Sequence, residues 1–194
     1  MPTETREKIL QAAFRTLSRM GYAAATIKDI ADEAGVAPGL VYYYFDSKLA
    51  LVMAVLAMAC EDMSLNEAAA STEGILDVFE QVKAMLRESE EANRLFVQLI
   101  GVGLHDREVG AGILDFVRQD RGGAEQLARR VLDSAELPAS SAAAMAAAAW
   151  GGVLGIMIQK LLDPQFDADA AVDALAAMAV AAVTRPAVTR PAVA

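Results

Sequence analysis

Three consecutive tyrosines, Tyr42, Tyr43 and Tyr44, carry the clearest binding chemistry in this chain. Each combines an aromatic face that can stack with a hydroxyl that donates and accepts hydrogen bonds. If the segment is helical, successive residues are rotated by about 100° around the axis, so the three rings spread over roughly 200°. They cannot all enter one core. At least one ring must therefore face outward, where a partner could meet it.

The residues around the tyrosines predict two short helices joined by a tight turn. Apolar residues recur with helical spacing over 27–34 and over 37–45, and Gly35 lies between the two segments. Thr26 is the expected N-cap of the first helix, with Asp29 at the acidic position of a capping box. Glycine at position 35 permits the positive φ of a tight turn. Together these features are typical of a helix-turn-helix.

A helical wheel of residues 37–45 separates an inner face from an outer face. Gly39 lies near the centre of the outer face, Tyr42 and Tyr43 flank it, and Tyr44 is turned toward the core. In a DNA major groove, one flanking tyrosine could reach a phosphate, and the other a thymine methyl or a base edge. An ordinary helix hairpin is the less favoured alternative, because two exposed tyrosines beside an exposed glycine stabilise nothing.

The stretch TIKDIADEAGVAPGLVYYYFDSKLALV resembles the DNA-binding segment of the tetracycline-repressor (TetR) family of transcription regulators. The shared pattern is a helix that begins at Thr, then Ile-Ala, Ala-Gly-Val, a small turn residue, a hydrophobic residue before Tyr-x-Tyr/His-Phe, and a Lys that opens the next helix. The specific match covers about residues 5–55. The resemblance implies a helix-turn-helix that binds DNA and a helical remainder that binds a small effector.

The resemblance also implies two sets of DNA contacts. The residues that would contact phosphates are Thr26, Tyr42, Tyr44 and Lys48, with Lys28 as a looser candidate. The residues that would lie against bases are Pro38, Gly39 and Tyr43. Ala37 belongs to the same surface but stands where the family often has Ser or Thr. The recognition helix therefore lacks a capping hydroxyl and one phosphate contact, a loss of roughly 0.5–2 kcal/mol.

Composition and periodicity predict an all-α chain of about nine helices. The chain is 55% hydrophobic and rich in alanine, and it has no long β-branched runs. We expect a three-helix helix-turn-helix domain over residues 1–48, and a helical bundle for effector binding and dimerisation over 49–184. Residues 185–194, with their prolines and no amphipathic pattern, are expected to be a disordered tail. One long helix over 106–135 is expected to be irregular because four glycines interrupt it.

Charge and cysteine content bound the class of protein. The net charge is −9, but residues 1–50 are neutral overall and residues 51–194 carry the whole excess of acidic side chains. This asymmetry suggests an N-terminal DNA-binding domain followed by an acidic domain. The single cysteine rules out an internal disulfide. Charged or polar residues such as Gln159 and Lys160 are expected to keep every apolar run below the ~18 residues of a membrane span. With no secretory signal at the N-terminus, a cytoplasmic location is expected.

The residue types needed for catalysis or metal binding are scarce. His105 and Cys60 are the only histidine and cysteine, which are too few for a zinc site within one chain. No serine lies in a nucleophile turn, and no glycine-rich loop could hold a phosphate. His105 is interpreted as a capping or core residue more readily than as a catalyst. We therefore expect no enzyme activity, no metal and no cofactor.

Small residues near the C-terminus predict a dimer interface, because they let helices pack closely. Its candidates are Ala142, Gly151, Gly155, Ala170, Ala174, Ala177 and Ala181. Close packing inside one subunit is the alternative. A dimer would place two helix-turn-helix modules on the half-sites of a palindrome.

Large apolar residues with a few polar neighbours predict an effector chamber. Its candidates are Met58, Asp62, Phe79, Phe96, His105, Phe116, Trp150 and Met157. So few polar groups suit a mostly apolar organic molecule. The resemblance implies a repressor, and we therefore expect such an effector to release it from a palindromic operator. The alternative function is a helical small-molecule-binding or interaction protein without significant DNA binding.

Overall fold

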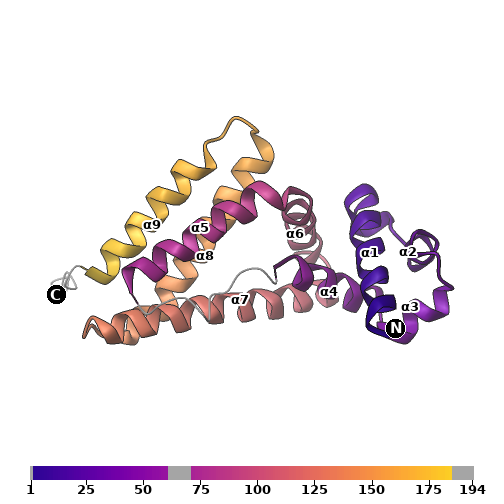
Figure 1. Cartoon of the computed structure of the whole chain (residues 1–194), viewed down its shortest axis with the longest axis horizontal. Helices are drawn as coiled ribbons and strands as arrows, with labels where there is room; N and C mark the ends of the chain where they lie inside the picture. The colour runs from indigo at the N-terminus through magenta and orange to yellow at the C-terminus, as the bar shows by residue number, and fades with distance from the viewer. Residues whose placement is uncertain (1, 61–70, 185–194) are drawn as a thin grey trace. The chain divides into compact units, whose positions relative to one another are not determined.

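All described secondary structure is helical, which confirms the predicted all-α class. The computed structural model describes residues 2–60 and 71–184, and Figure 1 labels the helices. A 3₁₀ turn, Ala139–Ser141, precedes α8. The α-helices in the described residues are α1 (Pro2–Ala24), α2 (Ile27–Ala34), α3 (Pro38–Tyr44), α4 (Lys48–Cys60), α5 (Thr72–Glu88), α6 (Glu90–Gly103), α7 (Arg107–Ser134), α8 (Ala142–Leu162) and α9 (Ala168–Thr184).

The chain divides into two compact units. Unit 1 comprises residues 1–62 and 86–119, and unit 2 comprises residues 63–85 and 120–194. The helix-turn-helix segment thus shares a unit with α6 and the first half of α7. These units are defined by packing, whereas the sequence analysis divided the chain by function after residue 48. The functional division stays a prediction. The expected tail, residues 185–194, lies outside the described residues.

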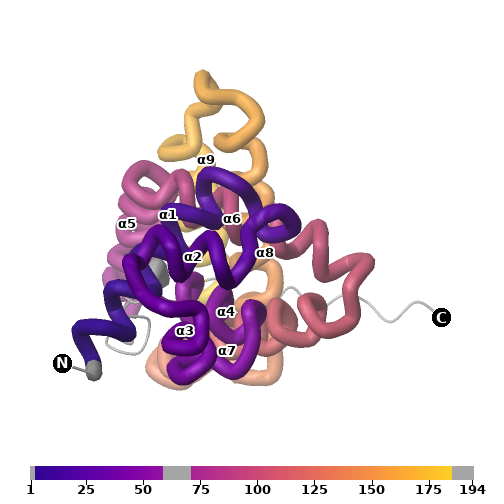
Figure 2. Tube along the Cα trace, turned by 90° about the vertical axis from the view of Figure 1, so that its right-hand side faces the viewer, coloured from indigo at the N-terminus to yellow at the C-terminus, as the bar shows by residue number. Residues whose placement is uncertain are grey.

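Helix α1 is the centre of unit 1. It packs against α2, α4 and α6, and Figure 2 views the chain from the end at which α1, α2 and α3 lie. Its apolar residues recur at the spacing expected of an amphipathic helix, and Ile9, Ala13 and Leu17 are fully buried. At Gly21 the backbone leaves the helical conformation, with φ 76° and ψ 166°. The helix therefore bends where the sequence predicts its end.

Glycines in α6 and α7 serve close packing of helices. A Cβ atom on Gly110 would lie 2.5 Å from the backbone oxygen of Gly103, so the two helices cross with almost no space between their backbones. A Cβ atom on Gly112 would lie 3.3 Å from the Met53 sulfur, which brings α4 close to α7. Helix α7 runs unbroken from Arg107 to Ser134, so the expected irregularity of this segment is wrong.

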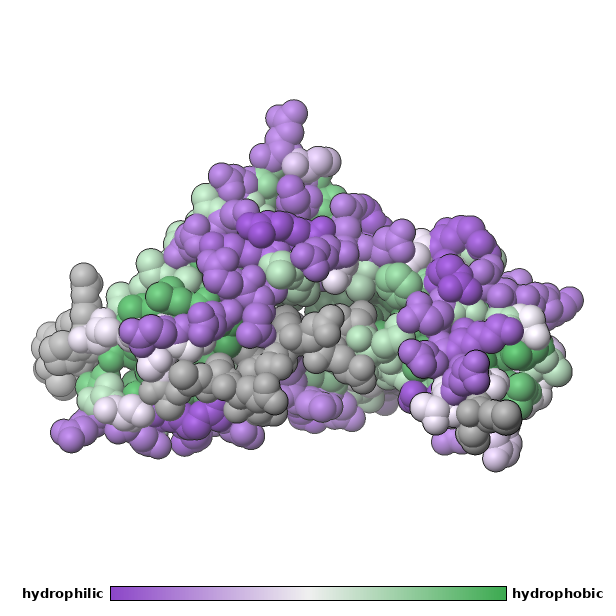
Figure 3. Space-filling model, in the orientation of Figure 1, coloured by the Kyte–Doolittle hydropathy of each residue, from purple (hydrophilic) through white to green (hydrophobic). Residues whose placement is uncertain are grey.

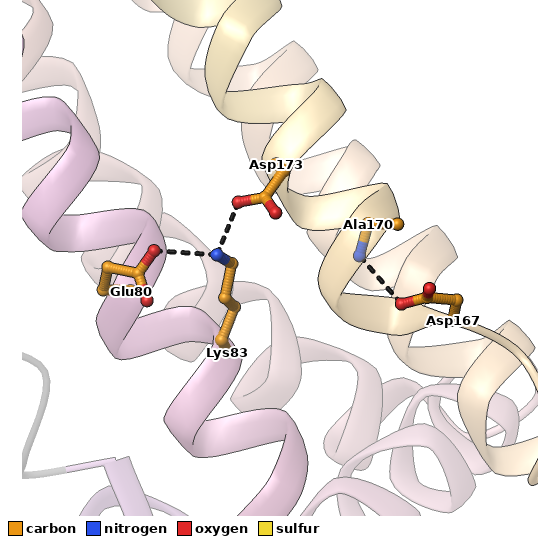
Figure 4. Close-up of polar contacts among 5 residues, drawn as sticks. All are labelled: Glu80, Lys83, Asp167, Ala170 and Asp173. Carbon is orange, nitrogen blue, oxygen red and sulfur yellow. Dashed lines mark hydrogen bonds and ion pairs between the residues drawn. The ribbon is translucent and has the colours of Figure 1, made fainter.

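Unit 2 contains a close pair of helices, α8 and α9. A Cβ atom on Gly152 would lie 2.8 Å from the Leu175 side chain, so α8 and α9 pack closely at this position. An ion-pair cluster joins α5 to α9: the buried Lys83 ammonium lies 2.7 Å from a Glu80 carboxylate oxygen and also contacts Asp173 (Figure 4). The two carboxylates together neutralise this buried cation.

Helix α8 is strongly apolar but little buried. An 18-residue window within 139–162 has a mean hydropathy of 1.7, and 22% of that window is buried. The expectation that no segment has the length and composition of a membrane span is therefore wrong, since Lys160 stands too near the helix end to interrupt the run. Core and interface helices of regulators have the same composition, so this observation is weak evidence for a membrane. In Figure 3, hydrophobic colour gathers in unit 2 around the C-terminal part of α9.

Replacement of Gly110 by alanine should destabilise the protein by about 1–3 kcal/mol, because the new Cβ overlaps the Gly103 carbonyl. Gly101→Ala is the matched control, since a Cβ at that α6 position meets nothing within 4 Å. The control should stabilise α6 by up to about 1 kcal/mol. Urea unfolding of both variants measures the difference. Equal stability of the two variants would show that α6 and α7 do not cross this closely.

Candidate DNA-binding interface

Both ends of α2 are fixed by the hydrogen bonds that the sequence predicts. The Thr26 hydroxyl accepts from the Asp29 amide at 3.1 Å, and an Asp29 carboxylate oxygen accepts from the Thr26 amide at 2.9 Å. The Thr26 hydroxyl also donates to an Asp29 carboxylate oxygen at 2.6 Å. This bond first, and then the bond from the Thr26 amide, hold the pKa of the Asp29 carboxyl below its usual range. Gly35 ends the helix with φ 63°, and the Val36 amide donates to the Ala31 carbonyl at 3.0 Å. The turn before α3 is therefore well defined.

Helix α3 is attached by its inner face and lacks a capping side chain. Val41 is fully buried and Phe45 is 6% exposed, so these two residues tie α3 to the rest of unit 1. The Arg6 guanidinium lies 5.2 Å from the centre of the Phe45 ring. Pro38 occupies the first turn, where its fixed φ favours a helix, but Ala37 makes no side-chain cap bond. The missing cap predicted from the sequence is confirmed.

The outer face of α3 is open. Tyr43 is 79% exposed and Tyr42 is 55% exposed. Gly39 between them is exposed, and a Cβ atom there would meet nothing within 4 Å. Tyr44 is half-buried and packs edge-on against Tyr43, with ring centres 5.2 Å apart. The predicted exposure of two tyrosines and partial burial of the third are confirmed.

Two arginines of α1 brace α2 through one carboxylate. Arg15 lies 3.0 Å from one oxygen of Glu33, and Arg19 lies 3.6 Å from the other. The Arg15 hydrogen bond is the main reason why the pKa of the Glu33 carboxyl falls below its usual range. All three side chains reach solvent, so the pairs add orientation more than stability. They join the surface of α1 to that of α2, the helix that precedes the turn to α3.

The predicted phosphate contacts have different surroundings. Thr26 and Lys28 are exposed, and Lys28 lies in the first turn of α2. Lys48 is half-buried, and its ammonium donates to the Tyr22 carbonyl and lies 4.3 Å from the centre of the Tyr22 ring. Burial lowers the pKa of the Lys48 ammonium, and the nearby Asp29 carboxylate acts in the opposite direction. Lys48 is thus turned toward the end of α1.

The effector candidates of unit 1 do not share one environment. Phe96 of α6 and Phe116 of α7 pack together, with ring centres 5.4 Å apart. The Met58 sulfur accepts a weak hydrogen bond, 3.7 Å long, from the Gln11 amide. His105 is exposed in the turn between α6 and α7, which gives no support to its placement in a chamber wall, and that placement stays a prediction. Asp62 lies outside the described residues.

The candidates of unit 2 are two buried apolar residues and a tryptophan with a polar partner. Phe79 and Met157 are buried. The half-buried Trp150 donates its indole N–H to an Asp120 carboxylate oxygen at 2.7 Å. Burial raises the pKa of the Asp120 carboxyl, and the Trp150 bond partly offsets the rise. A hydrogen-bond acceptor that was not among the predicted chamber residues therefore lies beside Trp150.

Most of the predicted interface residues lie on the surface. Ala170, Ala174, Ala177 and Gly151 are exposed, and Gly155 and Ala181 are half-exposed. On α9, this stripe lies opposite the buried residues Ala168, Val172, Ala176 and Val183. Ala142 is fully buried in its own chain, so its assignment to the interface is wrong.

The sequence analysis did not single out Tyr22, Lys83 or Asp120. Each of them interacts with a residue that is distant in the sequence, and such contacts leave little local signal. Tyr22 follows a helix-ending glycine, which was the one local signal available for it. Lys83 stands on the inner face of an amphipathic helix, where a charge needs a partner, and helical spacing could have marked it. Nothing local distinguishes Asp120 from the surface acids. Among the described residues no group of three or more His, Cys, Asp or Glu could hold a metal ion.

The N-terminal segment matches a family model. Residues 9–55 match the family described as "Bacterial regulatory proteins, tetR family". These residues include α2, α3 and the greater part of α4, so the match lies on the geometry described above.

Relatives extend the similarity beyond this segment. The HTH-type transcriptional regulator UidR of Escherichia coli is 30% identical over 132 residues, which cover 63% of this chain and 67% of UidR. TtgR of Pseudomonas putida, also an HTH-type transcriptional regulator, is 45% identical over 53 residues, or 27% of this chain and 25% of TtgR. The solved structure of Salmonella enterica GusR has a TM-score of 0.74 at 18% identity, covering 94% of this chain and 96% of GusR. The chain therefore belongs to the TetR family of DNA-binding transcriptional regulators.

Proposed function

We propose that this regulator represses its target by binding a palindromic operator as a homodimer, with α3 in the major groove, and that a mostly apolar small molecule releases it. The observation that carries the proposal is the outer face of α3: a glycine with open space above it between two exposed tyrosines. That face adds nothing to the core. Its exposure is explained if it meets base edges.

Base reading is assigned to Pro38, Gly39 and Tyr43. The bare backbone at Gly39 permits close approach to the floor of the groove, and the Tyr43 ring can press against a thymine methyl group. Thr26, Lys28 and Tyr42 are exposed around this centre, where they can contact phosphates and fix the register on the duplex. Tyr44 supports the Tyr43 ring edge-on and is the least accessible of the proposed contacts.

Dimerisation through α8 and α9 is supported by the apolar surface that these helices leave exposed. Leu162 at the end of α8 is 80% exposed, and Met178, next to Ala177 on α9, is 61% exposed. Such surface is costly in water and is typical of an interface. A dimer would hold its two recognition helices one or more turns of DNA apart and would make twice the base contacts of a single subunit.

The effector is proposed to bind beside aromatic and methionine candidates, and in unit 2 the Trp150–Asp120 pair supplies a polar feature. Helix α4 is the proposed coupling element on the DNA side, because three residues separate it from α3 and it packs against α1 and α6 within unit 1. The effector can act only through a difference in its affinity for the DNA-bound and free conformations. The proposed place of action is the cytoplasm.

The alternative of a helical binding protein without DNA recognition is disfavoured. The relatives of this chain are named as HTH-type transcriptional regulators and not as binding proteins of another kind. The helix-turn-helix of this chain has both caps of α2 and an open outer face on α3, and a function without DNA binding does not account for these features.

Tyr43→Ala should lower affinity at one or two base positions of each half-site by about 1–3 kcal/mol and leave unfolding unchanged, because the ring is exposed. Tyr43→Phe is the matched control: it keeps the ring and should keep sequence preference if apolar contact carries the reading. Selection of duplexes bound by each variant measures both effects. An unchanged preference in Tyr43→Ala would place the recognition surface elsewhere.

Ala177→Arg should convert the dimer to monomers and abolish tight binding of a palindrome, because it puts a charge on the exposed stripe of α9. Ala111→Arg introduces the same charge at an exposed alanine of α7 and should leave the dimer intact. Analytical ultracentrifugation distinguishes the two states. Dimers in both variants would move the interface away from α9.

An apolar effector and the operator should weaken each other's binding by the same factor, since the coupling between two sites is reciprocal. Trp150 is the only tryptophan, so its fluorescence reports binding directly. Titration of a panel of hydrophobic compounds with and without operator gives the two affinities. A compound that binds equally well in both titrations is not an inducer that acts by this mechanism.

A further inference from the structure

We propose that Arg6 and Lys8, near the start of α1, contact operator phosphates where the chain enters and leaves the groove that α3 occupies. The contacts assigned above all lie on α2, on α3 or at the start of α4, so these two cations add a further helix to the interface. The inference rests on the proposed placement of α3 in the major groove.

Arg6 lies at the C-terminal end of α3. Its guanidinium is 5.2 Å from the centre of the Phe45 ring, and Phe45 is the C-cap residue of α3. Phe45 is 6% exposed, whereas Arg6 is exposed. A guanidinium that stacks on an aromatic ring still presents the N–H groups of its edge, which fit a phosphate in pairs. Arg6 is therefore held in a position from which it can bind an anion.

Lys8 lies at the other end of the recognition helix, beside the turn that precedes it. A Cβ atom on Gly35 would lie 3.8 Å from the Lys8 ammonium. Only Val36 and Ala37 separate Gly35 from the start of α3. Lys8 is exposed, so its ammonium is accessible from solvent at this turn. The two cations thus accompany the two ends of one short helix.

The width of the major groove explains why these ends meet phosphates. A helix with its side chains is about 10–12 Å across, and the groove is about 12 Å wide. A helix in the groove therefore fills it, and the segments that lead into and out of the helix pass close to the phosphates that border it. Lys8 accompanies the first of these segments and Arg6 the second.

Neither cation has an acidic partner in the part of the chain that the structure describes. Arg15 and Arg19, the other cations of α1, both pair with Glu33. No carboxylate of the described residues lies within 4.0 Å of the charged group of Arg6 or Lys8. Exposed cations without a partner, in a chain whose net charge is −9, are available to an external anion.

The N-terminal segment also has few other charges with which to bind DNA. Residues 1–50 hold six basic side chains, and two of them share one carboxylate. Without the two cations at the start of α1, only Lys28 and Lys48 of this segment would remain to neutralise phosphates. Such neutralisation supplies the sequence-independent part of DNA affinity. The helix itself gains little from these charges, since its dipole favours cations at the C-terminal end.

The test uses full-length variants and two duplexes, one selected from random sequence by the purified protein and one of random sequence and equal length. Arg6→Gln and Lys8→Gln should each weaken both duplexes by the same factor, because phosphates carry no sequence information. Each should lower the slope of log affinity against log salt by about 0.9 for each bound subunit. The deficit relative to the wild type should therefore shrink about 3.5-fold per subunit between about 50 and 200 mM salt.

Two further variants control for the change of charge. Arg94→Gln removes an exposed cation of α6 that pairs with Glu90, and it should leave the slope unchanged. Arg6→Lys keeps the charge beside Phe45 and should restore most of the slope that Arg6→Gln loses. Circular dichroism confirms that each variant is folded at the assay temperature.

Uncharged phosphates locate the contacts. In a set of selected duplexes, one phosphate at a time is replaced by a neutral methylphosphonate. For Arg6 and for Lys8, we expect a position at which the replacement weakens the wild type but not the corresponding glutamine variant, because both changes remove one contact.

The inference is overturned for either residue if its glutamine variant keeps the wild-type slope. It is also overturned if that variant weakens the selected duplex more than the random one at a constant slope, because the side chain would then hold α3 in place without meeting a phosphate. A wild-type protein without salt-dependent affinity for either duplex would overturn the proposed function as well, and this outcome differs from a steep slope that the variants retain.

Discussion

Burial of the inner face of α1 is the constraint on which the rest of unit 1 depends. Ile9, Ala13 and Leu17 have no exposed surface, and the helix that carries them packs against α2, α4 and α6 at once. Removing a large apolar side chain from such a site costs about 2–5 kcal/mol. Any movement of α6 or α4 is therefore transmitted to α2 through a closely packed core and not through a flexible link.

In the short helix α3, the residues that stabilise the fold differ from the residues proposed to bind DNA. Helix α3 is held by Val41 and Phe45, both buried, while its outer residues contribute almost nothing to the core. The caps of α2 and the Gly35 turn fix the orientation that α3 inherits. A seven-residue helix without a capping side chain would not persist alone in water, so its conformation depends on these neighbours.

Local signals in the sequence predict the helix-turn-helix almost completely. Capping at Thr26, the glycine turn at position 35 and the outward direction of Tyr43 follow from residue type and helical period, and all three agree with the structure. Contacts between distant segments do not follow from such signals. The exposed His105, the buried Ala142 and the pairing of Trp150 with Asp120 depend on how helices cross, which periodicity does not encode. Within a single helix, glycine indicates a break, but Gly110 and Gly112 of α7 are explained by the close approach of α6 and α4.

The open space above Gly39 has a consequence for how this regulator can change over generations. A Cβ atom there meets nothing within 4 Å, whereas a Cβ on Gly103 or Gly110 would lie within 3.0 Å of backbone atoms. Substitutions at position 39 can therefore alter what the recognition helix meets while the fold keeps its stability. A duplicated copy of this gene could acquire a new target through a few changes on one surface, with no compensating change in the core. The same freedom explains how a single scaffold can serve many regulatory circuits.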